Sequence, residues 1–266
     1  MPVRVLRRSW LWVLVVGLGA FFGLVALVTG GNHGLIGATI VVGSAVVPVA
    51  MVAYIGSYER RLDAGRHRLI PPGSIVWSFL GGGAIGVIAA GLVEFVVLRQ
   101  LSIPQLFAVG LIEETAKLIV PVVIFLGGRY RSEADGLLFG IASGMGFAML
   151  ETIGYGLTAF TQSGGDVNTL TQTLLVRGLL SPAGHAAWTG MVCAVLWRQR
   201  DRAGRPVFNL AVAAAFIAAI VLHALWDISG MSSVPPAASM AGYVVIGVAS
   251  LVLLAWHIRH AGRQPA

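Results

Sequence analysis

The sequence predicts an all-α protein, a bundle of about eight helices that crosses a membrane with both ends of the chain in the cytoplasm. Three observations lead to this fold class. The chain of 266 residues is 57% hydrophobic and only 11% charged, with a mean hydropathy of +0.85, whereas soluble domains carry about 25% charged residues. The apolar residues form long runs. Arginines stand in short clusters between these runs.

Eight apolar segments have close to the length of a membrane helix, which needs about 20 residues for a hydrocarbon core about 30 Å thick. The first follows arginines but is long and lacks a small-residue cleavage site, so we expect a retained anchor rather than a signal peptide. We find no internal repeat, and we expect one integral membrane domain over residues 1–266. The segments are Trp10–Val28, Gly34–Ile55, Ser74–Leu98, Gln105–Leu126, Ala134–Phe160, Leu179–Trp197, Leu210–Ile228 and Ala238–Ile258.

The arginine clusters orient this bundle. They lie before the first segment, in every second loop and after the last segment, while the opposite side carries only Arg99 and Arg177. Because basic residues mark the cytoplasmic side, we expect both termini there. The same clustering accounts for the net charge of +7, so we expect no nucleic acid partner. The clusters are Arg4, Arg7, Arg8; Arg60, Arg61, Arg66, Arg68; Arg129, Arg131; Arg198, Arg200, Arg202, Arg205; and Arg259, Arg263.

The third to seventh segments carry ionisable residues inside apolar runs, where each charge costs about 2.5–3.5 kcal/mol on insertion scales. In the fourth segment, Glu113 and Lys117 are an i,i+4 pair on one helix face, and Lys117 is the only lysine in the chain. Glu114 points about 100° away from Glu113. One carboxylate can therefore pair with Lys117 while the other faces a cavity or another helix.

The fifth to seventh segments bring further polar groups to a similar depth. Glycines at 136, 140 and 144 form a small-residue face on the fifth segment, which permits close packing and would bring Glu151 against its neighbours. From the helical rise, Glu113, Glu151, His185 and His223 all lie about 9–14 Å from the outer ends of their helices. Asp227 lies nearer the outer surface. The i,i+4 spacing of His223 and Asp227 suits two ligands of one metal, or an imidazole oriented by a carboxylate.

Four stretches resemble the motifs of the PrsW family of intramembrane proteases, which is distantly similar to the CaaX prenyl-endopeptidases and bacteriocin-processing enzymes. The stretches are EETAK, GMGFAMLE, SPAGHAAWTG and HALWD. They match EExxK, FxxxE, a lone histidine and HxxxD, in the family's order and over about residues 104–230. Thr152 departs from the asparagine that often follows the FxxxE glutamate. The first, second and eighth segments carry no motif.

The resemblance implies an intramembrane endopeptidase in which Glu113 and Glu114 are the catalytic pair and Lys117 is their counter-charge. It also implies that a second set of residues completes the site and binds zinc or another divalent metal. Two histidines with a carboxylate suit a catalytic zinc. The substrate would be a membrane protein, such as an anti-sigma factor, cut near its extracytoplasmic side. The implied metal-binding residues are Glu151, His185, His223 and Asp227.

The residues alone leave other interpretations open. Glu113, Glu114 and Lys117 could form a structural ion-pair group, and His185 could simply bridge two helices. A proton-coupled transporter or channel also gathers Glu, His and Asp in the membrane, although such proteins often show internal repeats. A non-catalytic member that binds membrane partners is a third interpretation. Glu94 matches no motif and suggests a structural or pathway-lining residue. We expect His33, His67, His257 and His260 to be solvated or interfacial.

Overall fold

The structure, a computed structural model, describes residues 9–62, 70–97 and 103–262, and every regular element among them is a helix. The predicted all-α fold class is therefore confirmed. A 3-10 turn, η1 (His33–Leu35), precedes α3, and a π-helical turn, η2 (Pro182–Ala186), joins α7 to α8. The long helices are α2 (Ser9–Thr29), α3 (Ile36–Leu62), α4 (Pro72–Val97), α5 (Ile103–Leu126), α6 (Glu133–Gln162), α7 (Val167–Leu180), α8 (Ala187–Ala203), α9 (Leu210–Ser229) and α10 (Pro236–Ala261).

Seven stretches of the described residues are long and apolar enough to cross a membrane. They correspond to seven of the eight predicted segments, and α7, η2 and α8 together form one of them, Val167–Ala203. The remaining predicted segment, the fourth, forms α5, which has 24 residues. It falls outside the seven because it carries Glu113, Glu114 and Lys117 within its apolar sequence. The chain is thus a multi-pass membrane protein.

The helix predicted to begin at Leu179 begins much earlier, at Val167. The side chain of Asp166 caps this helix by accepting hydrogen bonds from the backbone N–H groups of Asn168 and Thr169, at 3.2 and 2.9 Å. Hydrogen bonds from the Thr169 side chain and backbone hold the pKa of Asp166 below its ordinary value. Polar residues in the first turns hide this amphipathic helix from a search for apolar runs. The prediction of a loop over most of α7 is therefore wrong.

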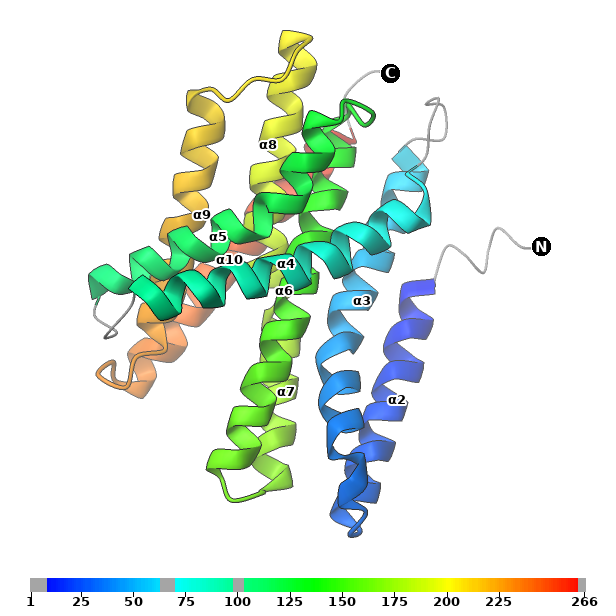
Figure 1. Cartoon of the computed structure of the whole chain (residues 1–266), viewed down its shortest axis with the longest axis vertical. Coiled ribbons are helices and arrows are strands. Elements are labelled where there is room, and N and C mark those ends of the chain that lie inside the picture. Colours follow the sequence, from blue (N-terminus) through cyan, green and yellow to red (C-terminus); the bar gives the residue numbers. More distant parts are fainter. Residues whose placement is uncertain (1–8, 63–69, 98–102, 263–266) are drawn as a thin grey trace, which may run out of the picture.

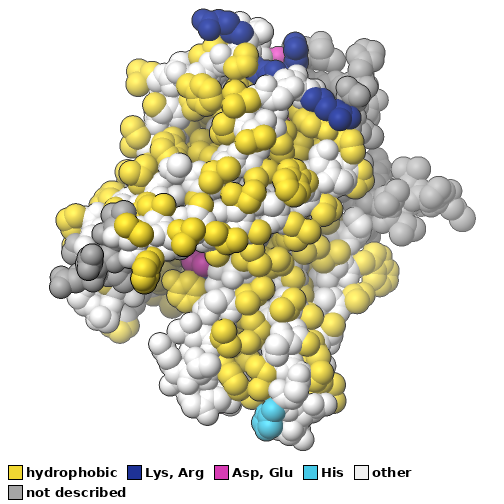
Figure 2. Space-filling model, in the orientation of Figure 1, with side chains coloured by type: hydrophobic (Ala, Val, Ile, Leu, Met, Phe, Trp, Pro, Cys, Tyr) yellow, Lys and Arg dark blue, Asp and Glu magenta, His cyan; other side chains and the backbone are white. Residues whose placement is uncertain are grey.

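The helices alternate in direction, and α4 and α5 cross the others obliquely (Figure 1). The C-terminal ends of α3, α5, α8 and α10 lie toward one end of the bundle, and those of α2 and α6 lie at the opposite end. Arginine side chains gather at the first of these ends (Figure 2). This alternation agrees with the arginine pattern of the sequence. The cytoplasmic location of that end stays a prediction.

Glycines on one face of α6 allow α8 to approach its backbone closely. A Cβ atom placed on Gly140 would lie 2.6 Å from the carbonyl oxygen of Thr189, and one on Gly136 would lie 2.6 Å from the Trp197 ring. A Cβ on Gly144 would meet the carbonyl oxygen of His185. The predicted small-residue face is therefore confirmed, and it brings α6 against η2 and α8.

The opposite face of α6 packs equally closely on α4. A Cβ on Gly83 would lie 2.6 Å from the carbonyl carbon of Gly146, and a Cβ on Gly146 would meet the carbonyl oxygen of Phe79. The Ser143 hydroxyl donates to the carbonyl oxygen of Lys117 at 2.6 Å, which ties α6 to α5 as well. Helix α6 is thus held between α4, α5 and α8, and its side chains reach all three.

A buried polar group at the arginine-rich end joins α6, α8 and α10. Arg198 forms an ion pair with Glu133, and its Nη2 lies 2.9 Å from Nδ1 of His257. His260 Nδ1 lies 3.0 Å from Glu133 Oε2. The expectation that His257 is solvated is wrong, because this group buries it to 4% exposure, whereas His33 is exposed as expected. His67 lies outside the described residues.

We expect Gly146→Val to destabilise the protein more than Gly154→Val. Both glycines lie in α6, but a Cβ on Gly146 meets the backbone of α4, whereas a Cβ on Gly154 has no atom within 4 Å. Overpacking of this kind costs about 1–3 kcal/mol. The measurement is the thermal unfolding of each purified variant in detergent. Equal midpoints for the two variants would contradict the close α4–α6 contact.

Candidate active site

The site is built around one buried ammonium group on α5. Lys117 Nζ lies 2.8 Å from Glu114 Oε1 and 3.1 Å from Glu113 Oε2, and the lysine side chain is fully buried. Both glutamates therefore pair with Lys117, and the expectation of a single pair is wrong. The long lysine side chain places Nζ between the two carboxylates, although they project in different directions from the helix. This pairing compensates charges that would otherwise be costly in the membrane.

His223 brings α9 to the same carboxylates. Its Nδ1 lies 2.8 Å from Glu114 Oε1, while its Nε2 lies 3.6 Å from Glu113 Oε2 and 3.4 Å from Asp227 Oδ2. The Thr189 hydroxyl of α8 is a further partner of Glu114, at 3.5 Å from Oε2. Glu114 thus has partners on α5, α8 and α9. Its side chain is 1% exposed, whereas that of Glu113 is 11% exposed.

A second polar group lies on α6, α7 and η2. Glu151 Oε2 is 2.8 Å from Arg177 Nη2 and 3.3 Å from His185 Nε2. The Arg177 guanidinium also stacks over the ring of Tyr155, at 3.7 Å. His185 stands in the π-helical turn η2, a type of turn that occurs frequently at functional sites.

Aromatic rings connect the two polar groups. The Trp188 ring stacks with His223, with ring centroids 5.1 Å apart, and also contacts His185 at 6.3 Å. Lys117 Nζ lies over the Phe147 ring, 4.5 Å from its centroid, and the centroids of the Phe147 and His185 rings are 5.9 Å apart. The structure therefore brings the side chains of all four motifs into one connected cluster, although they come from four separate stretches of the chain.

The four residues implied as metal ligands do not converge on one point. They form two pairs, Glu151 with His185 and His223 with Asp227. Nowhere in the described ranges are three His, Cys, Asp or Glu side chains placed to hold a metal ion. Arg177 already compensates Glu151, as Lys117 compensates the other glutamates. As they are arranged, these donors do not fit a metal.

Sequence reasoning did not assign three residues that belong to this cluster. Trp188 and Thr189 contact the motif histidines and glutamates, but an aromatic or hydroxyl residue in an apolar run carries no distinct signal. Arg177 did carry a sequence signal, because it is an arginine at the arginine-poor end of the bundle. An arginine that departs from the charge asymmetry of a membrane protein needs a local reason.

Glu94 approaches the cluster from α4. Gly83, Gly86 and Ala90 share one face of this helix and pack against α6, Phe147 and Ala116. Glu94 follows Ala90 by one helical turn, so it continues the same face. Its Oε1 atom is buried and has no hydrogen-bond partner. Its role, structural or pathway-lining, stays a prediction.

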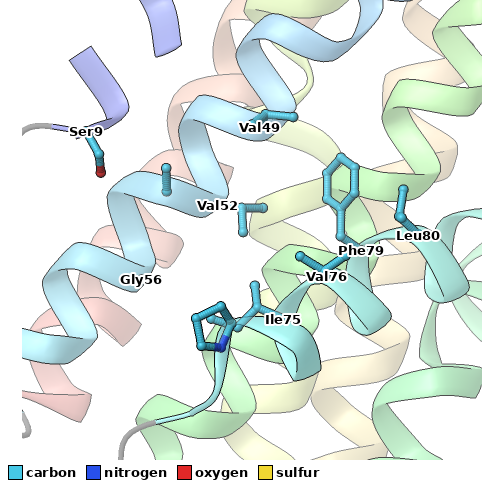
Figure 3. Close-up of a pocket in the computed structure, with 10 residues that line it drawn as sticks. Ser9, Val49, Val52, Gly56, Ile75, Val76, Phe79 and Leu80 are labelled. Carbon is cyan, nitrogen blue, oxygen red and sulfur yellow. The ribbon is translucent and has the colours of Figure 1, made fainter. Parts of the chain in front are cut away.

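The two cavities with clear outlines lie apart from these polar groups. Figure 3 shows a cavity of about 380 Å³ between α2, α3 and α4, with Val49, Ile75 and Phe79 among its apolar lining residues. A second cavity of about 580 Å³ lies between α5, α8 and α9. Neither is lined by a residue of the polar cluster.

We expect Lys117→Met to destabilise the protein by about 3–5 kcal/mol, because it leaves two buried carboxylates without their counter-charge. Adding Glu114→Gln to this variant removes one of those charges and should restore part of the loss. Thermal unfolding of wild type, the single variant and the double variant tests both expectations. Wild-type stability of Lys117→Met would show that the buried ion pairs are not needed for folding.

Comparison with known proteins agrees with this site. A family model described as PrsW family intramembrane metalloprotease matches residues 70–255, which is well over half of the chain. The match begins before α4 and ends within α10, so it contains every residue of the cluster described above. Neither the curated proteins nor the solved structures contain a match to this chain. On the strength of the family match, the chain belongs to the PrsW family of intramembrane metalloproteases.

Proposed function

We propose that this intramembrane protease uses Glu113 as the general base that activates water for hydrolysis of a peptide bond in a membrane protein substrate. One observation carries the proposal. The four motif stretches meet in one connected cluster of polar and aromatic side chains, and Glu113 is the more accessible of its two adjacent glutamates, at 11% against 1% side-chain exposure. A general base must reach the water molecule whose proton it takes.

Glu114 has a different role in this proposal. Its partners Lys117, His223 and Thr189 surround both of its oxygens, so it holds the ammonium and the imidazole in place. This arrangement leaves Nε2 of His223 directed between Glu113 and Asp227. An oriented imidazole beside the base can carry a proton between the base and the substrate.

The reaction then proceeds by acid and base steps. Glu113 takes a proton from water, and the water oxygen attacks the carbonyl carbon of the scissile bond. The tetrahedral intermediate collapses when a proton reaches the amide nitrogen, from Glu113 directly or through His223 Nε2, 3.6 Å away. The C–N bond breaks, and a carboxylate and an amine leave. No step of this scheme depends on a metal.

We further propose that zinc or another divalent ion, if it is this protein's cofactor, takes its ligands from the two pairs formed by Glu151, His185, His223 and Asp227. In their present positions the pairs are separate, and Arg177 neutralises Glu151. Binding one ion with both pairs would require them to approach each other.

We also propose that cleavage occurs near the extracytoplasmic face, in a single-span protein such as an anti-sigma factor. Arg177 lies ten residues beyond the Val167 end of α7, or about 15 Å by helical rise. Among the described residues, arginine side chains gather at the opposite end of the bundle. An acidic side chain is visible in a hollow below α4 and α5 in Figure 2, on the side away from those arginines. A hollow of this kind would give water a short path to the site.

Glu113→Gln and Glu114→Gln should each abolish or strongly reduce cleavage while the protein still accumulates in the membrane. Glutamine preserves the size of the side chain but cannot accept the proton or bear the negative charge. Mass spectrometry of peptide termini in membranes with wild-type or variant protein measures the loss and identifies the substrate. Asp166→Asn is the matched control, because Asp166 is exposed and asparagine also caps helices. Undiminished cleavage by both glutamine variants would refute the base assignment.

The cleaved bond should lie in the outer part of the substrate's transmembrane segment or just outside it. The same mass spectra locate the bond from both fragments. Cysteines introduced at Asn32 and Asp166, both exposed, should react with an impermeant reagent on intact cells, while one at Arg202 should not. The native Cys193 is fully buried and should not react with the reagent. If the labelling is as expected but the bond is cut on the cytoplasmic side, the proposed depth of the site in the membrane is wrong.

A further inference from the structure

We propose that Arg177 is a further catalytic residue, whose guanidinium donates hydrogen bonds to the carbonyl oxygen of the scissile peptide bond. The inference rests on the proposed hydrolysis. It assigns a role to a residue of α7, a helix that carries none of the four motifs.

Two contacts hold the guanidinium in a fixed position within the site. Its Nη2 lies 2.8 Å from Glu151 Oε2, and its central carbon lies 3.7 Å from the centre of the Tyr155 ring. The aromatic ring fixes the plane of the guanidinium, and the ion pair keeps it beside Glu151. The Arg177 side chain remains 26% exposed, so a substrate can reach it.

Arg177 has donors that the protein itself does not use. A guanidinium carries five N–H donors in a planar fork and has no acceptor. The Nε atom of Arg177 is buried without a hydrogen-bond partner. Buried polar atoms are nearly always paired in native proteins, so the guanidinium keeps hydrogen-bonding capacity that no protein group satisfies.

The other cationic and imidazole groups of the cluster are either paired or less exposed than Arg177. Lys117 is fully buried and already binds both Glu113 and Glu114. His223 has Glu114 at Nδ1 and two carboxylates near Nε2. His185 Nε2 lies 3.3 Å from Glu151 Oε2, and its side chain is only 14% exposed. Among these groups, Arg177 has the most exposed side chain, at 26%.

The chemistry of the reaction needs such a donor. When water attacks, the carbonyl oxygen gains a negative charge, and the site is otherwise rich in carboxylates that would repel it. A guanidinium stays charged at any pH that the cell meets, and its fork can bind a carboxylate and a carbonyl oxygen together. This role also explains why an arginine stands at the arginine-poor end of the bundle.

The test compares Arg177→Gln and Arg177→Lys with wild type, using a single-span membrane peptide that carries the cleavage site found by mass spectrometry. Arg202→Gln is the matched control, because Arg202 is exposed in the last turn of α8. We expect kcat to fall about 10²–10³-fold in Arg177→Gln, as for the loss of one oxyanion donor. We expect a smaller fall in Arg177→Lys, which keeps the charge but loses the fork. The control should retain wild-type kcat.

A second comparison separates a direct role from an effect through Glu151. If Arg177 acts on the substrate, the double variant Arg177→Gln, Glu151→Gln should have a lower kcat than Glu151→Gln alone. Equal kcat values for those two variants, or wild-type kcat in folded Arg177→Gln or in Arg177→Lys, would overturn the inference. Thermal unfolding reports the folded fraction of each variant. If wild type cleaves the peptide and Glu113→Gln does not, these overturning results count against the role of Arg177 alone. If wild type does not cleave the peptide, the proposed function itself fails.

Discussion

The ion pairs of Lys117 with Glu113 and Glu114 are the constraint on which the rest of the structure depends. Three charged residues make α5 too polar to count among the membrane spans by composition, although it has 24 residues. The helix can lie among apolar neighbours only because the ammonium sits between the carboxylates at 2.8 and 3.1 Å. The remaining partners, His223 and Thr189, then have a fixed carboxylate against which to pack.

The glycines of α6 set how close the other groups can come to that centre. Backbone contact with α4 on one side and with η2 and α8 on the other leaves no room for side chains at Gly140, Gly144 or Gly146. Such close packing compensates for the absence of a hydrophobic driving force between helices in lipid. It also brings Glu151 within reach of His185, whose carbonyl oxygen faces Gly144, and of Arg177.

Local spacing in the sequence was enough to predict the all-α class, the glycine face of α6 and the Glu113–Lys117 pair, because each depends on helical periodicity alone. The burial of His257 was not predictable, since Glu133 and Arg198 come from other helices. The start of α7 was missed because a polar helix with an Asp166 cap resembles a loop in a hydropathy profile. The separation of the implied metal ligands into two pairs was not predictable either, since Arg177, which pairs with Glu151, lies outside the four stretches.

The π-helical turn η2 determines which residues of α7 and α8 face the same way. A π turn contains one residue more than an α-helical turn, and it usually persists where that extra residue is useful. Here it sets the rotation between Arg177 before the turn and Trp188 and Thr189 after it. Loss of a single residue from this turn would keep one continuous helix but rotate everything beyond it by about 100°. The number of residues in this segment is therefore constrained more tightly than their identities. Related chains should differ here by substitution and not by insertion or deletion.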